Sequence, residues 1–193
     1  MKIIGITGGV GSGKSAVLQL LQQEYGAVVV QLDEVAKKLQ KKGTPCWNEI
    51  IEVFGTEILD ETKELDRKKL AQIVFQDQEK LARLNAIVHP AVKQYVLLDI
   101  EEKRKAKTSL YVLEAALLLE AGYDKICEET WFIYTEESIR RARLKASRGY
   151  SDNRITDMIK SQNPESYFRR NCTRMIDNSG TMEATKRQIG EIL

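Results

Sequence analysis

Short runs of apolar, mostly β-branched residues recur along the chain and predict the strands of a buried sheet. The clearest run is KIIGIT at residues 2–7, and AVVVQLD (27–33), SLYVLEA (109–115) and TWFIYT (130–135) follow it; RMID (174–177) is a shorter and weaker fifth. Continuous apolar runs of this length indicate strands that are buried on both faces. Helical stretches separate them, so the pattern predicts an α/β fold with a five-stranded parallel sheet flanked by helices.

Helical periodicity begins directly after the first predicted strand and its glycine-rich turn. The segment SAVLQLLQQEYG starts at Ser15 and ends at Gly26, a residue type that commonly caps a helix C-terminus. Its apolar residues fall mainly on one side: Val17, Leu18, Leu20 and Leu21.

The spacing between the second and third predicted strands indicates an insertion. About 75 residues separate them, far more than an ordinary crossover needs. Helical periodicity fills that segment in CWNEIIEVFG, DRKKLAQIVF, QEKLARLNAIV and PAVKQYVLLDIEEKRKAK. Proline suits the first turn of a helix and disfavours helix at the residue before it, so we expect a break at His89 and a new helix from Pro90.

A second insertion follows the fourth predicted strand and is helical, polar and rich in arginine. No repeat, low-complexity stretch or Gly/Ser linker separates the parts, so we expect both lobes to grow out of one domain of residues 1–193. The predicted parts are a core of residues 1–33, 109–135 and 171–193, an inserted helical lobe of residues 34–108 and a helical lid of residues 136–170.

Composition restricts the partners that the chain can have. Thirty basic and 28 acidic residues leave a formal charge of +2, too balanced for a protein that coats nucleic acid or an anionic membrane. Cys46, Cys127 and Cys172 are odd in number and scattered, which fits neither a disulfide framework nor a metal-ligand cluster. No signal-peptide core and no apolar run near the ~18 residues of a membrane span are present. We therefore expect a soluble, cytoplasmic protein.

The stretch GGVGSGKS at residues 8–15 carries the clearest chemistry. Gly8, Gly13, Lys14 and Ser15 satisfy the pattern G-x-x-x-x-G-K-[ST] of a phosphate-binding loop (P-loop), with a predicted strand before it and a helix after it. Glycines let successive backbone N–H groups turn toward an anion, and the helix N-terminus adds its partial positive charge. The lysine brings a full charge to the outer phosphates, and the serine hydroxyl is a ligand for Mg²⁺. We expect ATP and Mg²⁺ here.

A P-loop indicates a nucleotide without naming a reaction. A GTPase switch is expected to show the guanine-reading sequence N-K-x-D, which is absent, and motor ATPases usually have larger chains. A small P-loop core with a helical lobe and an arginine-rich lobe instead favours a kinase that acts on a small molecule. A nucleotide-binding regulatory protein without phosphotransfer and a GTP-dependent switch are kept as alternatives.

Two acidic residues are expected at the carboxyl ends of strands, where ligands of open α/β sheets bind. Asp33 ends the second predicted strand and can act as the general base toward an acceptor hydroxyl, although aspartate is also a good helix N-cap. Glu114 ends the third and can hold Mg²⁺ through water, or it can be an exposed loop residue.

Basic residues outside the P-loop give further candidates. His89 can contact substrate, or it can simply cap or pack at a helix start. A phosphoryl-transfer site needs cations beyond Lys14, so we expect one or two lid arginines to close over ATP and exclude water. The arginines of this region are Arg140, Arg141, Arg143, Arg148 and Arg154, followed by Arg169 and Arg170.

Taken in order, several segments resemble the dephospho-coenzyme A kinase family over essentially the whole chain. They are IGITGGVGSGKS, QLDEVAKKL, LDRKKLAQIVF leading into LNAIVHPAV, EAALLLEAGYD, RITDMIKSQ and MIDNSGT. The resemblance implies ATP-dependent phosphorylation of the ribose 3′-hydroxyl of dephospho-coenzyme A, with Asp33 matching the family's proposed base. It also implies a core, a substrate lobe and a lid. A kinase of the same architecture that acts on a nucleoside monophosphate or another small metabolite is the alternative.

The resemblance also implies binding residues. Asn178 is expected near the ATP adenine, and Arg67 and His89 in the substrate lobe. In the family the lid arginine usually falls two residues after an Arg-Leu pair and one residue pair before a glycine. Ser147 and Arg148 occupy that region here, so Arg141, Arg143 and Arg148 all remain candidates for ATP contact. The complete predicted ATP site is Gly8, Gly9, Val10, Gly11, Ser12, Gly13, Lys14, Ser15 and Ala16, with Arg141, Arg148 and Asn178. The expected partners are ATP and dephospho-coenzyme A, in a monomer or weak homo-oligomer.

Overall fold

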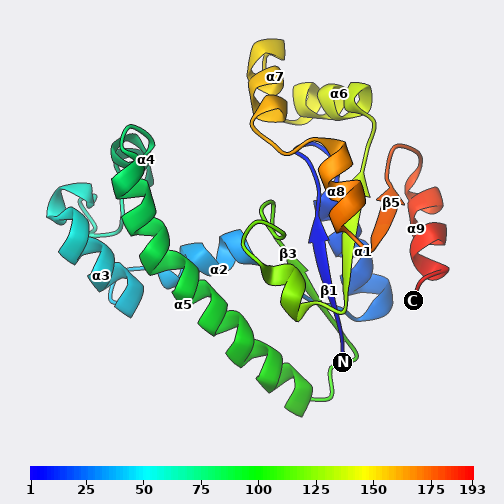
Figure 1. Cartoon of the computed structure of the whole chain (residues 1–193), viewed down its shortest axis with the longest axis horizontal. Coiled ribbons are helices and arrows are strands. Elements are labelled where there is room, and N and C mark those ends of the chain that lie inside the picture. The colour runs from blue at the N-terminus through cyan, green and yellow to red at the C-terminus, as the bar shows by residue number, and fades with distance from the viewer. The chain divides into compact units, whose positions relative to one another are not determined.

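The computed structural model describes all 193 residues and confirms the predicted sheet (Figure 1). Its five strands lie in the order β2-β3-β1-β4-β5, and β1 pairs in parallel with β3 and β4, as does β4 with β5. Parallel pairing brings the carboxyl ends of these strands to one edge. The strands are β1 (Lys2–Thr7), β2 (Val28–Gln31), β3 (Leu110–Glu114), β4 (Glu129–Tyr134) and β5 (Arg174–Asp177).

Helices fill the segments that showed helical periodicity. Several begin at capping residues that the sequence supplies; Asp77, for example, accepts hydrogen bonds from two backbone N–H groups at the start of α5. The α-helices are α1 (Lys14–Tyr25), α2 (Leu32–Leu39), α3 (Pro45–Phe54), α4 (Arg67–Phe75), α5 (Gln78–Lys105), α6 (Glu137–Arg148), α7 (Asp152–Lys160), α8 (Glu165–Asn171) and α9 (Met182–Gly190); the short 3₁₀ helices are η1 (Thr56–Ile58) and η2 (Tyr123–Ile126). None of the helices combines the length and apolar composition that crossing a bilayer requires.

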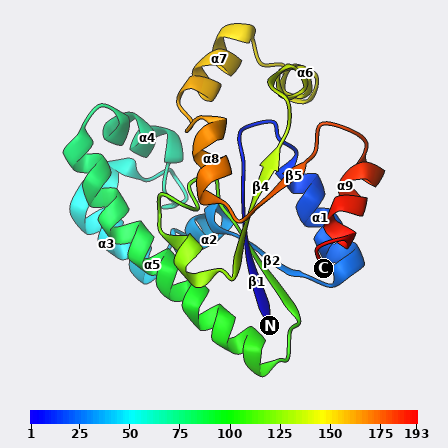
Figure 2. The same cartoon turned by 45° about the vertical axis from the view of Figure 1, so that its right-hand side comes forward.

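The two faces of the sheet bury different helices because successive side chains of a strand point to opposite faces. Trp131 and Ile133 of β4 belong to a buried cluster with residues of α1 and α9. Phe132, between them, faces the other way and stacks on Phe168 of α8, with ring centroids 4.9 Å apart. Figure 2 shows α1 and α9 on one side of the sheet and α8 on the other. The core helices thereby hold β4 from both faces.

The chain divides into two compact units. The first is the sheet unit, residues 1–30 with 107–193, which includes the predicted lid of residues 136–170. The second is the helical unit, residues 31–106. It differs by only a few residues at each end from the helical lobe predicted for residues 34–108. The roles of lobe and lid stay predictions.

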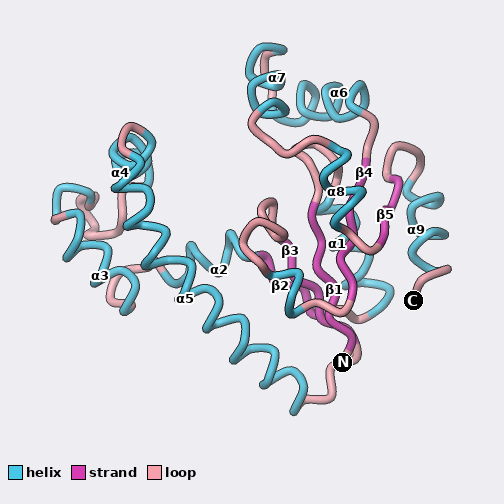
Figure 3. The backbone as a smooth tube through the Cα atoms, in the orientation of Figure 1, coloured by secondary structure: helices cyan, strands magenta, loops and turns pink.

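The expected break at His89 and Pro90 is wrong. Helix α5 continues through both residues as one helix of 28 residues (Figure 3). A proline inside a helix costs about 3 kcal/mol or more because one backbone hydrogen bond is lost. Here a stripe of buried residues at four-residue spacing runs across the proline, and packing along that stripe offsets the loss: Val88, Val92, Val96 and Ile100.

The position expected for Asp33 also needs correction. Strand β2 ends at Gln31, and Asp33 lies in the first turn of α2 rather than at the end of the strand. The N-cap of α2 is Gln31, so Asp33 is not the capping residue either. An acidic side chain in a first helical turn is favoured by the helix dipole, which explains how the sequence accommodates it there.

Candidate active site

The P-loop connects the buried strand β1 to α1 and approaches other backbone closely. A Cβ atom on Gly8 would lie 2.6 Å from the carbonyl oxygen of Ile133, and one on Gly13 would lie 2.4 Å from Nδ2 of Asn178. Gly13 is also the N-cap of α1 and has a left-handed backbone, with φ +83°. Side chains at either position would therefore displace the loop, which is why the pattern needs glycine there.

Backbone donors of the P-loop are available to an anion. No hydrogen bond within the chain uses the N–H groups of Gly11, Gly13 or Ser15. The Nζ atom of Lys14 donates a hydrogen bond of 2.9 Å to the carbonyl oxygen of Gly8, which places its charge across the mouth of the loop. Unpaired N–H groups at a helix N-terminus together with a lysine form a phosphate site.

Glu114 extends this site from the neighbouring strand. It ends β3, as expected, and one carboxylate oxygen lies 3.8 Å from Nζ of Lys14. Its side chain is only 11% exposed, so the alternative of an exposed loop glutamate is wrong. Lysine and glutamate thus meet at the carboxyl edge of the sheet.

Two arginines of α6 contact the P-loop. The Nε atom of Arg140 donates to the carbonyl oxygen of Val10 at 2.9 Å, and its guanidinium packs against Gly9. Burial lowers the pKa of Arg140. Arg143 donates at 2.9 Å to the carbonyl oxygen of Asn178. Positive charge from the predicted lid therefore lies directly against the loop.

Arg141 and Arg148 lie elsewhere. Arg141 pairs with Glu137 at 2.8 Å and bonds to the hydroxyl of Thr156, whereas Arg148 lies over the ring of Tyr150. Of the three candidates left open, Arg143 is the one that the structure brings to the P-loop. ATP contact of Arg141 and Arg148 stays a prediction.

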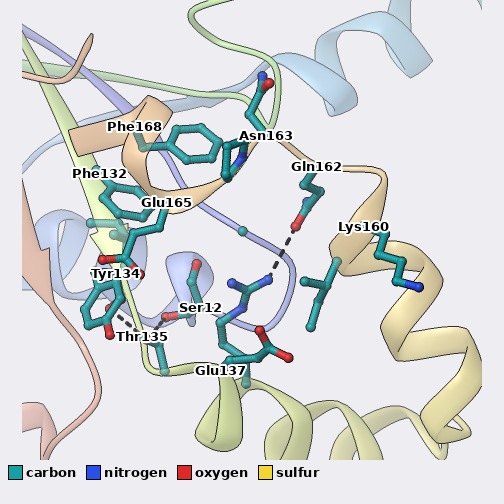
Figure 4. A pocket seen from close by; sticks show the side chains of 15 residues that line it. Ser12, Phe132, Tyr134, Thr135, Glu137, Lys160, Gln162, Asn163, Glu165 and Phe168 are labelled. Atoms are coloured by element: carbon teal, nitrogen blue, oxygen red, sulfur yellow. Dashed lines mark hydrogen bonds between the residues drawn. The ribbon is translucent and has the colours of Figure 1, made fainter. Parts of the chain in front are cut away.

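A cavity of about 460 Å³ opens beside the P-loop, within the sheet unit. The side-chain oxygen of Gln162, in the link from α7 to α8, accepts the backbone N–H of Val10 at 3.0 Å and the Arg140 guanidinium at 3.5 Å. Figure 4 shows the Gln162 side chain at the cavity with a dashed hydrogen bond from its oxygen. Phe132 and Phe168 form an apolar part of the wall. A cavity of this size, apolar on one side and polar on the other, is typical of a small-molecule site.

Asn178 follows β5 and lies under the P-loop. Its side chain is buried, and its Nδ2 atom donates to the carbonyl oxygen of Ser12 at 2.8 Å. Its Oδ1 atom accepts the hydroxyl of Thr185 at 2.9 Å. Both ends of the amide are therefore used within the protein, and the implied contact with adenine stays a prediction.

Three predicted substrate residues belong to the helical unit and lie on its surface. Asp33 is exposed, and its carboxylate makes no hydrogen bond or ion pair within the chain. Arg67 bonds to the side chain of Gln40 at 3.0 Å, and His89 is exposed in the middle of α5. His89 is not at a helix start, so the capping role considered for it is wrong.

Comparison with known proteins assigns the family. The sequence model of the dephospho-CoA kinase family matches residues 2–184. The chain is 37% identical over 193 residues to a dephospho-CoA kinase of Carboxydothermus hydrogenoformans, covering 100% of this chain and 93% of that protein. This chain belongs to the dephospho-CoA kinase family. A dephospho-CoA kinase of Geobacillus kaustophilus is 36% identical over 190 residues, covering 98% of this chain and 94% of that protein.

Solved structures place the fold in the same group. Protein TT1252 from Thermus thermophilus superposes with a TM-score of 0.83 at 33% identity, over 99% of this chain and 95% of its own. A shikimate kinase from Bacteroides thetaiotaomicron gives a TM-score of 0.57 at 14% identity, covering 99% of this chain and 97% of its own, which shows a shared fold alone. This chain therefore has the P-loop kinase fold that the sequence predicted.

The donor set at the P-loop fits a magnesium ion bound together with phosphate. Ser15 offers an exposed hydroxyl and Glu114 a carboxylate, and Mg²⁺ prefers such oxygen ligands. No group of three or more His, Cys, Asp or Glu side chains is placed to hold a metal by itself. In a kinase family this is expected, because substrate phosphates and water complete the coordination.

Sequence reasoning named Arg140 only as one of several arginines, and it missed two contacts with the loop: that of Gln162 with Val10 and that of the Thr135 hydroxyl with the carbonyl oxygen of Ser12. Helical register could have indicated the role of Arg140, because Leu144 is the buried residue of α6 and lies against Gly11. Positions three and four residues apart share a helix face, so Arg140 lies on the face of Leu144. Gln162 lies in a loop, where no periodicity places a side chain.

Proposed function

We propose that this chain transfers the γ-phosphoryl group of ATP to the ribose 3′-hydroxyl of dephospho-coenzyme A, giving coenzyme A and ADP. The observation that supports this most strongly is a P-loop with unpaired N–H groups in a chain that matches one kinase family over residues 2–184. The P-loop supports binding of the nucleotide, and the family match supports the acceptor.

The P-loop residues hold the donor. Backbone N–H groups of Gly11, Gly13 and Ser15 bind phosphate oxygens, and Lys14 compensates charge on the outer phosphates. Arg140 adds a second cation beside the loop, through its contact with Val10. Charge that develops on the transferred group is stabilised by donors already held in place.

Ser15 and Glu114 would hold Mg²⁺, the first through its hydroxyl and the second through water. The ion would supply positive charge that offsets the charge of the phosphoryl oxygens. Because Glu114 already lies 3.8 Å from Lys14, its carboxylate also orients that lysine.

Asp33 acts on the acceptor. Its carboxylate has no partner within the chain, so it is available to accept a hydrogen bond from the 3′-hydroxyl and take the proton as the phosphoryl group leaves ATP. Arg67 and His89 contribute to acceptor binding in the helical unit. A cytoplasmic location and a monomeric or weakly oligomeric state complete the proposal.

One assay of ADP release tests the proposal. The acceptors are dephospho-coenzyme A, cytidine monophosphate, adenosine, shikimate and gluconate, each with ATP and Mg²⁺. Turnover is expected with dephospho-coenzyme A only. Equal or faster turnover with another acceptor contradicts the proposed substrate, and no ADP with any acceptor contradicts the proposed transfer.

A further inference from the structure

The carbonyl oxygen of Ser12 receives three hydrogen-bond donors. Nδ2 of Asn178 lies at 2.8 Å, Oγ1 of Thr135 at 2.9 Å and Nη1 of Arg143 at 3.4 Å. These side chains come from the end of β5, the end of β4 and the lid helix α6, all within the sheet unit. A single peptide of the P-loop is therefore held from three elements.

Asn178 is the most firmly placed of the three. It is 2% exposed, and its backbone N–H donates to the carbonyl oxygen of Tyr134 at 2.8 Å. Thr185, itself fully buried, holds Oδ1 of the amide at 2.9 Å. Because the Ser12 carbonyl can only accept, the amide atom facing it has to be the nitrogen. The orientation of the side chain is thus determined by its partners.

The held carbonyl belongs to the same peptide as the N–H of Gly13. That N–H has no partner within the chain, and it stands at the N-cap of α1, where an anion is bound most favourably. Donors to a carbonyl polarise its peptide and strengthen the N–H at the other end as a donor. They also fix the rotation of the peptide, which at Gly13 has the positive φ of +83° that glycine permits.

We propose that Asn178 is a positioning residue for the P-loop: it holds the Ser12–Gly13 peptide so that the Gly13 N–H stays turned toward the nucleotide phosphates. The inference rests on the proposed binding of ATP at this loop. It differs from the adenine contact that the family resemblance implies, because the amide is buried and each of its ends already bonds within the protein, to Ser12 and to Thr185.

Binding of three ligands with Mg²⁺ separates the two roles: ATP, ITP and inorganic tripolyphosphate, which has no base. Asn178→Ala is expected to weaken all three by a similar factor of about tenfold, the size expected when a buried carbonyl loses the shortest of its hydrogen bonds. The preference for ATP over ITP should change by less than about twofold. Asn178→Asp should bind all three ligands more weakly still, because it turns an anionic oxygen toward the carbonyl oxygen of Ser12.

Gln188→Ala is the matched control. Gln188 bonds to both backbone groups of Asp177, the residue before Asn178, at 2.9 and 2.8 Å, yet it does not touch the P-loop. The Gln188→Ala variant therefore loosens the junction of β5 and α9, while Asn178 still bonds to the carbonyl oxygen of Ser12. Affinities within about threefold of wild type are expected for this variant, and a loss equal to that of Asn178→Ala overturns a positioning role.

Loss of ATP binding with tripolyphosphate binding retained also overturns the inference and favours adenine recognition. If Asn178→Ala does not fold, Thr185→Val and Thr135→Val carry the test: both should weaken the three ligands in parallel, and unchanged tripolyphosphate affinity in both overturns the inference. Wild-type ATP binding and turnover of dephospho-coenzyme A are measured first. Failure of the proposed function appears there, whereas failure of this inference appears only in the variants.

Discussion

The Nε atom of Arg140 donates a 2.9 Å hydrogen bond to the carbonyl oxygen of Val10, in the middle of the P-loop. The same loop residue donates its N–H to Gln162. Both backbone groups of one P-loop residue are therefore bound by side chains from the α6 to α8 region. The arginine-rich segment therefore contacts the phosphate site directly.

Arg140→Ala tests this connection. The variant loses a cation beside the phosphates and the contact with Val10, so kcat/KM for ATP is expected to fall by about 10²-fold, the scale of losing one donor to a transition-state charge. Arg140→Lys should recover part of the loss, since it restores charge without the fixed guanidinium geometry. Steady-state kinetics with dephospho-coenzyme A measure both.

Arg154→Ala is the control for that experiment. Arg154 lies in α7 and stacks on the ring of Tyr150, 3.9 Å from its centroid, without touching the P-loop. A change below about threefold is expected. If Arg140→Ala behaves like this control, Arg140 has no part in phosphoryl transfer.

Asp33→Asn tests the proposed general base. The carboxamide cannot accept the proton of the acceptor hydroxyl, so turnover is expected to fall by about 10²-fold or more, while the ATP concentration at half-maximal rate changes little. Glu34→Gln is the matched control, because Glu34 is the adjacent exposed acid and pairs with Lys37 at 2.6 Å. A loss below threefold for Asp33→Asn removes it from the catalytic residues.

Local patterns in the sequence were enough to predict the sheet and the P-loop. Strands buried on both faces produce continuous apolar runs, and the loop needs glycine, lysine and serine at fixed spacing, so both signals are contained in a few consecutive residues. The family resemblance added the acceptor and the family match bears it out. The residue-level roles of Asp33, Arg67 and His89 stay predictions.

Features that depend on tertiary packing were not predictable in the same way. The stripe from Val88 to Ile100 keeps α5 intact through Pro90, although the local preference of proline indicates a break. The contact of Asn178 with Ser12 likewise depends on strands that are 40 or more residues apart in sequence. Such contacts arise from the fold and have no local sequence signal.

Glu129 gives a prediction about pH and stability. Its carboxylate accepts Arg174 and the indole of Trp131 at 2.8 Å each and lies 3.1 Å from Lys2. The Arg174 hydrogen bond is the largest cause that lowers the pKa of Glu129 from 4.5 to about 2, with smaller effects from Trp131 and Lys2. When folding lowers the pKa of a carboxyl group, the ionised group stabilises the protein at pH values above its pKa in the unfolded state. That stabilisation is lost as the pH falls through the pKa of the folded state.

Thermal unfolding of Glu129→Gln at several pH values measures this contribution. The variant is expected to melt below wild type at pH 7, and the difference should shrink as pH falls from about 4.5 to about 2. Glu191→Gln is the matched control, because it removes an exposed acid at the C-terminus of α9. A gap between Glu129→Gln and wild type that stays constant down to pH 2 contradicts the assignment.

Phe168 connects α8 to the sheet and should contribute strongly to stability. It is 4% exposed and its ring stacks on Phe132 at an interplanar angle of 11°. Phe168→Ala is expected to lower the free energy of unfolding of the sheet unit by about 3–5 kcal/mol, because a buried ring is replaced by a cavity, and Phe168→Leu by less. Urea unfolding measures this loss. It is followed by the fluorescence of Trp131, which lies in β4 next to Phe132, in a Trp47→Phe background that leaves Trp131 as the one tryptophan.

Phe75→Ala provides the comparison, since this phenylalanine is 80% exposed and buries almost no ring surface. Its unfolding free energy should stay within about 0.5 kcal/mol of wild type. The packing of α8 also carries the link that presents Gln162 to Val10, so Phe168→Ala should weaken tripolyphosphate binding at temperatures where the protein is still folded. If Phe168→Ala costs no more stability than Phe75→Ala, the stacked pair does not anchor α8 to β4.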